Sequence, residues 1–369
     1  MLKALFEYMP FVAAALIVLG LVFPRCRQLQ LKTRTQAIWA MVILACCSKF
    51  ACYRMLGGDA FNPALPWPVM WIWNWAYSGA MIFLVLVLAC YFVRARAKLF
   101  VLPVLAWGLA AWGIWNGLRV PEVVETELGF ADLPAELDGY RILQLSDLHV
   151  SSSSRRWRTE AVVARANAAQ ADLIAITGDI ADGDPEKLWR DAEPLKDLRA
   201  KDGVYCVTGN HEYYGPWEKW SVCFSLWGMR FLSNECVFPR EGLALGGVND
   251  IRAWMRGADG PDVDAAFAAA TNGEFRVLLE HLPGNVLTNV REGDVRLQLS
   301  GHTHGGIMPG LSWLVKMHNG GYVRGVYRAP GRSGDRYLYV APGAGQWAGF
   351  PVRFFNSSEL SLVILRKVQ

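Results

Sequence analysis

Five clusters of His, Asp and Asn each follow a short apolar run between residues 141 and 306. The apolar runs predict strands, and the polar side chains come where each strand stops. Ligands gather beyond the carboxyl ends of strands in α/β folds, so the five clusters are expected to converge on one site. They lie in RILQLSDLHV, LIAITGDIADGD, VYCVTGNHE, VLLEHLP and VRLQLSGHTHGG. The candidate residues are Asp147, His149, Asp179, Asp182, Asn210, His211, His281, His302 and His304.

These residue types indicate a site for divalent cations. Carboxylate, amide and imidazole ligands without a thiolate suit Mn²⁺, Fe, Zn²⁺ or Mg²⁺. A carboxylate that bridges two cations holds them ~3.5–4 Å apart, so that they can share a hydroxide nucleophile and clamp a phosphoryl group for in-line attack. Five of the six histidines belong to the clusters, and the sixth, His318, is interpreted as structural or at the rim of the site. The pattern therefore predicts metal-dependent hydrolysis of a phosphate ester.

The elements that must position these residues alternate between short apolar runs and amphipathic segments. This alternation predicts a layered α/β fold over residues 140–369. Strands are expected at 140–145, 172–177, 204–208, 243–248, 275–280 and 295–300. Helices are expected at 155–169, 186–200, 216–228 and 262–270.

The charges divide the chain into two parts. Residues 1–119 contain 11 Lys or Arg and two acids, whereas the other 250 residues contain 26 Lys or Arg and 31 Asp or Glu. The second part, which carries the candidate site, is therefore acidic. A protein that binds nucleic acid needs cations on the binding domain itself, so no nucleic-acid partner is expected.

Residues 1–119 are predicted to be an all-α transmembrane region of about four helices. Apolar stretches long enough to cross a bilayer are expected to span it at about 4–23, 37–53, 66–93 and 99–118. Lys49 interrupts the second stretch near one end. A polar segment at 120–139 is interpreted as a linker to the catalytic domain.

The basic residues between these stretches predict the topology. They cluster at 25–34 and at 94–98, and positive loops remain in the cytoplasm. Parity then places the N-terminus and the catalytic domain on the periplasmic or extracellular side of a cell or inner membrane. Among the cysteines, the pairing of Cys223 with Cys236 stays open, because spacing alone does not decide it.

The ordered set DLH, GD, GNHE, H and GHTH resembles the calcineurin-like metallophosphoesterase superfamily, over roughly residues 140–345. The entry LPAELDGYRILQLSDLH and the exit SGHTHGG are similar to its bacterial membrane-associated branch. The resemblance implies a four-layer α/β/β/α sandwich and two metal ions, with manganese favoured over Fe, Zn or Mg. It assigns one metal to Asp147, His149, Asp179 and His304, and the other to Asp179, Asn210, His281 and His302, so that Asp179 bridges.

The resemblance also implies two catalytic roles. His211 matches the residue that faces the leaving-group oxygen, and Asp182 would orient it. The chain departs from the family after GHTHGG, where Ile307, Met308 and Pro309 follow directly. Substrate contacts from that loop are therefore not transferred.

The sequence alone is compatible with several functions. The substrate could be a phosphomonoester, a phosphodiester or a diphosphate, and four spans suggest a lipid-linked one in contact with membrane lipid. Alternatives are a hydrolase resembling those of UDP-2,3-diacylglucosamine in lipid A synthesis, and a non-catalytic membrane receptor or scaffold. A nuclease of the same superfamily is disfavoured by the acidic catalytic part.

Overall fold

The chain forms two compact units in the computed structural model. Unit 1 combines Met1–Gly117 with Ala348–Val352, and unit 2 combines Leu118–Trp347 with Arg353–Gln369. The structure describes residues 12–17, 20, 33–56, 58–59, 61, 63, 65–92, 101–271, 273–307, 311–329 and 335–368.

Unit 1 is helical throughout its described elements, as its apolar composition predicts. Helix α5 packs against α3, where the rings of Trp39 and Phe83 stack with centroids 6.4 Å apart. Two helices are long and apolar enough to cross a membrane, over Trp67–Cys90 and Val101–Leu118. The helices of this unit are α3 (Thr33–Cys47), α4 (Lys49–Met55), α5 (Trp67–Phe92) and α6 (Val101–Leu118).

The expected number of four spans is not reached within the described residues. They offer two spans, or three if the bent pair Ala37–Cys47 and Lys49–Met55 counts as one. The chain bends by 56° between the two helices of this pair, next to Lys49, the charge that interrupts the second apolar stretch. The first expected span, 4–23, lies largely outside the described residues.

Lys49 is buried inside unit 1. Its Nζ donates to the carbonyl oxygens of Ala348 (2.7 Å) and Gly349 (3.1 Å) and lies 5.1 Å from the ring centroid of Tyr77. A buried ammonium group is tolerated only where such hydrogen bonds replace its water. At the bend between α3 and α4, main-chain carbonyls therefore take the place of water around the buried ammonium group of Lys49.

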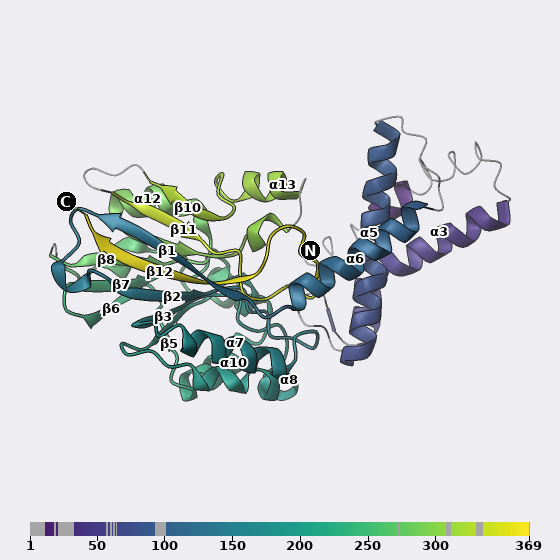
Figure 1. Ribbon diagram of the computed structural model, residues 1–369. Coiled ribbons are helices and arrows are strands. Elements are labelled where there is room, and N and C mark those ends of the chain that lie inside the picture. Colours follow the sequence, from purple (N-terminus) through teal and green to yellow (C-terminus); the bar gives the residue numbers. More distant parts are fainter. Residues whose placement is uncertain are drawn as a thin grey trace. The chain divides into compact units, whose positions relative to one another are not determined.

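Unit 2 contains two six-stranded sheets (Figure 1). The first sheet has the order β1-β12-β2-β3-β4-β5 and the second β10-β11-β9-β8-β7-β6. Strands of the first sheet are β1 (Glu122–Phe130), β2 (Arg141–Leu145), β3 (Leu173–Thr177), β4 (Val204–Val207), β5 (Arg230–Phe231) and β12 (Glu359–Lys367). Strands of the second are β6 (Glu235–Arg240), β7 (Leu243–Gly247), β8 (Phe275–Leu279), β9 (Leu297–Ser300), β10 (Gly325–Arg328) and β11 (Tyr337–Val340).

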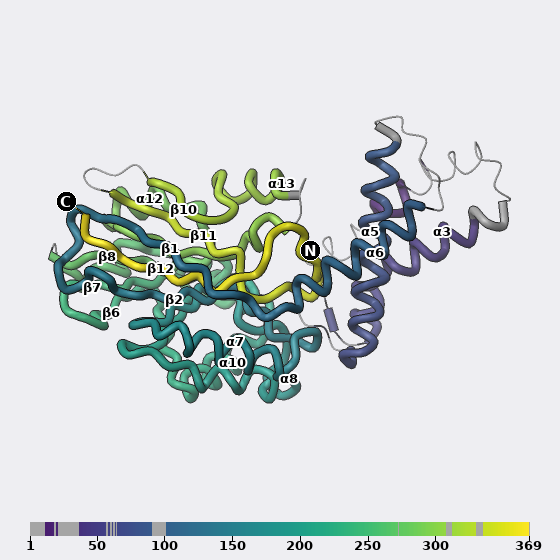
Figure 2. Tube along the Cα trace, viewed as in Figure 1, coloured from purple at the N-terminus to yellow at the C-terminus, as the bar shows by residue number. Residues whose placement is uncertain are grey.

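The predicted linker at 120–139 instead contains strand β1. This strand pairs in parallel with β12 along its whole length, although the two are more than 200 residues apart in sequence (Figure 2). Its sequence, EVVETELGF, is polar because β1 is an edge strand whose residues are partly exposed. An edge strand needs fewer apolar residues than a central one, which is why composition alone suggested a linker.

The six expected strands all form, and each is placed by its alternating side chains. In β2, Ile142 points into a core shared with the second sheet, whereas Leu143 and Leu145 point to the helices on the other face. The core between the sheets joins residues of both, for example Leu173 and Val277. Two buried faces per sheet explain why the central strands are largely apolar.

Helices cover the outer faces of both sheets (Figure 1). The predicted helix at 186–200 is split into α8 and a 3-10 turn, because Pro194 has no amide hydrogen to continue it. The helices of unit 2 are α7 (Arg156–Ala168), α8 (Pro185–Ala192), α9 (Asn210–Tyr214), α10 (Trp217–Leu226), α11 (Val263–Ala266), α12 (Val286–Glu292) and α13 (Leu311–His318). The 3-10 turns are η2 (Ala135–Leu137), η3 (Glu193–Asp197), η4 (Ile251–Arg256), η5 (Pro283–Asn285) and η6 (His304–Gly306).

Candidate metal centre

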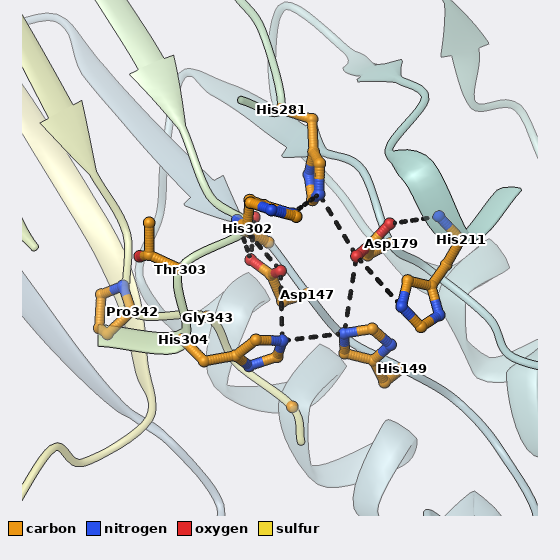
Figure 3. Close-up of polar contacts among 12 residues, drawn as sticks. Asp147, His149, Asp179, His211, His281, His302, Thr303, His304, Pro342 and Gly343 are labelled. Carbon is orange, nitrogen blue, oxygen red and sulfur yellow. Dashed lines mark hydrogen bonds and ion pairs between the residues drawn. The ribbon is translucent and has the colours of Figure 1, made fainter. Parts of the chain in front are cut away.

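The candidate residues lie just beyond the carboxyl ends of parallel strands in both sheets. Asp147 and Asp179 follow β2 and β3 by two residues, and Asn210 follows β4 by three. In the second sheet, His281 follows β8 by two residues and His302 follows β9 by two residues. Because the sheets face each other, the two rows of side chains meet, as Figure 3 shows.

Most of these residues adopt a backbone conformation that side chains other than glycine rarely take. The left-handed region costs energy and tends to occur at functional sites, where surrounding structure enforces it. The φ angles are 51° for Asp147, 44° for His149, 53° for Asp179, 68° for His302 and 49° for His304. The turns after the strands therefore aim these side chains inward at the expense of backbone strain.

A first group able to hold a cation consists of Asp147, His149 and His304. The Nε2 atoms of His149 and His304 are 3.1 Å apart, and His304 Nε2 is 3.6 Å from Asp147 Oδ1. Two facing imidazole nitrogens cannot both donate a proton to each other. The nitrogen lone pairs of the two histidines and the carboxylate of Asp147 point to one place, and such a set of donors suits a metal ion.

A second group consists of Asp179, His281 and His302. His281 Nε2 lies 3.3 Å from Asp179 Oδ2, 3.2 Å from His302 Nδ1 and 3.2 Å from Asn210 Oδ1. Asp179 Oδ2 is also 3.7 Å from His149 Nε2 of the first group. Asp179 therefore lies between the two groups, in the position that a bridging carboxylate requires.

His211 stands beside Asp179, with Nε2 3.9 Å from Oδ2. Geometry alone also lets His149, Asp179 and His211 form a third group for a cation. The opposite ring nitrogen, Nδ1, lies 2.8 Å from Asp182 Oδ1. Rings of Tyr214 and Trp347 flank His211 with centroids 5.7 and 6.0 Å away.

Asp182 contacts two histidines at once. Besides His211, its carboxylate lies 3.0 Å from His149 Nδ1, and its side chain is fully buried. Such a carboxylate fixes the orientation and tautomer of a histidine that binds metal through its other nitrogen. The sequence predicts a contact of Asp182 with His211 alone, and the contact with His149 is visible only in the structure.

Burial and neighbouring charges shift the pKa values of the acids and histidines of the site. Burial raises the pKa of Asp182, but the charges of His149 and His211 outweigh it and lower the pKa to about 2. Burial lowers the pKa of His211, but Asp182 and Asp179 outweigh it and raise the pKa to about 9. By contrast, burial and the neighbouring His281 lower the pKa of His302 to about 3. The lowered pKa favours the neutral form of His302, which is the form that can ligate a metal, and the raised pKa favours the protonated form of His211.

Glu212 supports the site although no role was predicted for it. Its carboxylate accepts hydrogen bonds from the backbone N–H groups of Gly209 (2.7 Å), Asp179 (2.9 Å) and Ile180 (2.8 Å). It thus joins the turn after β3 to the turn after β4. The motif GNHE, which ends in Glu212, could have indicated this supporting role, but no function was predicted for its glutamate.

The other residues singled out in the sequence lie at the border of the site or away from it. His318 lies on α13, where its Nδ1 is 2.9 Å from Leu314 O, and belongs to neither group. Residues 343–347 border the site, since Gly345 bonds to the backbone of Asp147 and Trp347 faces His211. Cys223 and Cys236 are both free. Met308 and Pro309, which depart from the family pattern, lie outside the described residues.

Comparison with known sequences identifies the domain. Residues 140–306 match the calcineurin-like phosphoesterase family, so the chain contains a metallophosphoesterase domain of this family. A metallophosphoesterase of Helicobacter pylori strain J99 is 34% identical over 253 residues, 69% of this chain and 66% of that protein. A zebrafish protein named "Transmembrane protein with metallophosphoesterase domain" is 32% identical and covers 70% of this chain and 60% of its own length. This chain thus spans somewhat less than two thirds of these relatives.

Among solved structures, the NAD nucleotidase of Haemophilus influenzae is similar with a TM-score of 0.41 and 15% identity. The matched region covers 56% of this chain and 46% of the nucleotidase chain. A likeness of this size carries no inference about function.

Proposed function

We propose that this chain is a membrane-anchored phosphoesterase that depends on two divalent ions, with manganese favoured. Its first metal would be held by Asp147, His149, Asp179 and His304, and its second by Asp179, Asn210, His281 and His302. The observation that carries the proposal is the position of Asp179 Oδ2, within 3.7 Å of a histidine from each of the two groups. Placement in a family of phosphoester hydrolases supports the reaction type.

The two ions, when bound, would supply an activated water and positive charge for the phosphoryl oxygens. The chain's own residues would do the rest. His211, protonated and held by Asp182, would give its proton to the leaving oxygen from Nε2. Asp182 would keep the rings of His149 and His211 in fixed orientations.

The test is His211→Ala, with His318→Ala as the matched control on α13. Two bound Mn²⁺ ions should remain in both variants. Hydrolysis of an alkyl phosphate should fall by roughly 10²–10⁴-fold in His211→Ala, the usual contribution of a general acid. An aryl phosphate, whose leaving group needs less help, should lose less. Equal losses on both esters would remove the acid role, and loss of an ion would instead place His211 among the ligands.

We further propose that the substrate is a lipid-linked phosphate or diphosphate. One support is α13, which follows the loop of His304 and exposes Trp313 (62%), Leu314 (43%) and Met317 (60%). A helix with exposed Trp, Leu and Met beside a lysine is typical of membrane interfaces. A second support is the short connection between α6 and β1, only three residues, which span at most ~11 Å. Where α6 crosses the bilayer, a connection of this length would keep the start of β1 within reach of the lipid headgroups.

This second proposal is tested on the full chain in lipid nanodiscs. The double variant Trp313→Ser, Met317→Ser should lose hydrolysis of a lipid phosphate while retaining hydrolysis of a soluble aryl phosphate. Val222→Ser, Leu226→Ser on α10 is the control, because these side chains are also exposed and apolar, at 58% and 80%. An unchanged ratio of the two activities in the α13 variant would contradict a lipid substrate presented at this helix.

The membrane topology completes the proposal. Four spans, with the catalytic domain on the periplasmic or extracellular side, agree with the two basic segments at 25–34 and 94–98. Membrane association itself is supported by the two apolar helices and by relatives named transmembrane proteins.

A further inference from the structure

Two buried arginines converge on one loop beside the proposed metal centre. Arg158, on α7, and Arg353, in the segment before β12, are each only 2% exposed. Their hydrogen bonds go to consecutive main-chain carbonyls of residues 342–345. Arg353 Nη1 donates to Pro342 O (2.7 Å), Arg353 Nε and Nη2 donate to Gly345 O (3.1 and 2.5 Å), and Arg158 Nη2 donates to Ala344 O (2.5 Å).

The other edge of this loop lies against the strand end that carries Asp147. The amides of Ala344 and Gly345 donate to Ser146 O (2.7 Å) and Asp147 O (2.8 Å). A Cβ atom added to Gly343 would lie 2.8 Å from Asp147 Cβ, and one added to Gly345 would overlap the backbone of residues 147 and 148. The loop thus touches Asp147 directly, and Figure 3 shows Pro342 and Gly343 next to Asp147 and His304.

Arginine suits this task for a physical reason. Its planar guanidinium presents five N–H donors in a fixed fork, so one side chain can hold several carbonyls in one arrangement. Burying such a cation is unfavourable unless those donors are used. Burial lowers the pKa of both arginines to about 10, so both stay charged at neutral pH. Arg353 Nη2 also lies 3.3 Å from His304 Nδ1, the far nitrogen of a second proposed ligand.

We propose that Arg158 and Arg353 are positioning residues for the metal held by Asp147 and His304. They act through the backbone of residues 342–345, which they press against Asp147, and they touch neither substrate nor metal. The sequence contained no sign of this role, because residues 158, 342–345 and 353 are separated by up to about 195 positions. The inference rests on the proposed two-metal function.

The experiment measures metal binding rather than turnover. Full-length protein in detergent is stripped with a chelator and titrated with Mn²⁺, and the free ion is followed by electron paramagnetic resonance. Arg353→Lys and Arg158→Lys keep a buried cation but lose the fork. Arg336→Lys is the control, because Arg336 is equally buried and bonds to Asp294, not to the loop.

The wild-type chain should bind two Mn²⁺ ions. In Arg353→Lys one of the two should bind about 10–100-fold more weakly, the usual effect of removing support behind a ligand, while the other is unchanged. Arg158→Lys, which loses one carbonyl contact, should show a smaller loss at the same ion, and Arg336→Lys none. Arg158→Lys also decides the matter if Arg353→Lys does not fold.

Each contrary result has a distinct meaning. Wild-type affinity for both ions in the Arg353 and Arg158 variants would overturn the positioning role. A similar loss in Arg336→Lys would also overturn it, since the effect would then reflect general destabilisation. A wild-type chain that binds fewer than two ions would instead contradict the proposed function.

Discussion

Replacement of Asp182 by asparagine tests the electrostatic reasoning of the site most directly. Asp182→Asn keeps the size of the side chain but removes the charge that faces His211 Nδ1 at 2.8 Å. Burial lowers the pKa of His211, and Asp182 is the first of the charges that raise it to about 9. Without that charge the pKa should return toward its ordinary value of about 6.5, a change of up to ~3 kcal/mol.

The magnitude follows from the protonated fraction of His211. At pH 8 a pKa of about 9 leaves roughly nine tenths of His211 protonated, whereas a pKa of about 6.5 leaves only ~3%, a loss of about 30-fold. At pH 6 the same change removes less than about a quarter of the protonated form. The direction of the pH dependence follows from the raised pKa of His211. Below pH 6.5 His211 is mostly protonated in both proteins, and as the pH rises the variant loses this proton first.

The assay is a pH–rate profile from pH 6 to 9 with saturating Mn²⁺, which offsets weaker ligation by His149. For an alkyl phosphate, the ratio of wild-type to variant rate should rise from about 1.3 at pH 6 to about 30 at pH 8, an increase of roughly 20-fold. For an activated aryl phosphate it should stay nearly constant, because that leaving group needs little protonation. A constant ratio with the alkyl ester, or the same rise with both esters, would refute the assignment of His211 and Asp182.

Three further predictions concern the metals, the fold and the topology. Asp179→Asn should lose both Mn²⁺ ions and nearly all hydrolysis, because one carboxylate serves both groups; metal analysis showing two ions with near-normal turnover would contradict the bridge. Glu212→Gln should lower the free energy of unfolding of the metal-free protein by about 1–3 kcal/mol in urea titrations, since one of three buried N–H groups would face an amide donor. A reporter active only outside the cytoplasm should be active after Gln369 and silent after Lys98, and the reverse pattern would place the domain in the cytoplasm.

The residues that meet at the site could be predicted because each cluster is a local pattern. An apolar run predicts a buried strand, and the polar residues that follow it mark the end where ligands collect. Neither inference needs to know which strands are neighbours. The same local reasoning finds long apolar helices such as α5 and α6, whose hydropathy depends on a single continuous segment.

Elements whose sequence is shaped by distant partners were not predictable in this way. Strand β1 is polar because it lies at a sheet edge beside β12, and composition made it resemble a linker. The break at Ser48 in unit 1 adjoins Lys49, whose carbonyl acceptors lie about 300 residues along the chain and could not be predicted from the local sequence.

The sequence by itself determined the candidate chemistry of this protein: the types of side chain proposed as ligands, their order along the chain and the strand ends that carry them. Only the tertiary structure decided how these groups are held. It gave Asp182 two histidines, placed Glu212 behind Asp179, and brought Arg158 and Arg353 to the loop beside Asp147. The reason is physical, because ligand type is a property of one side chain, whereas support is a property of contacts between segments far apart in sequence.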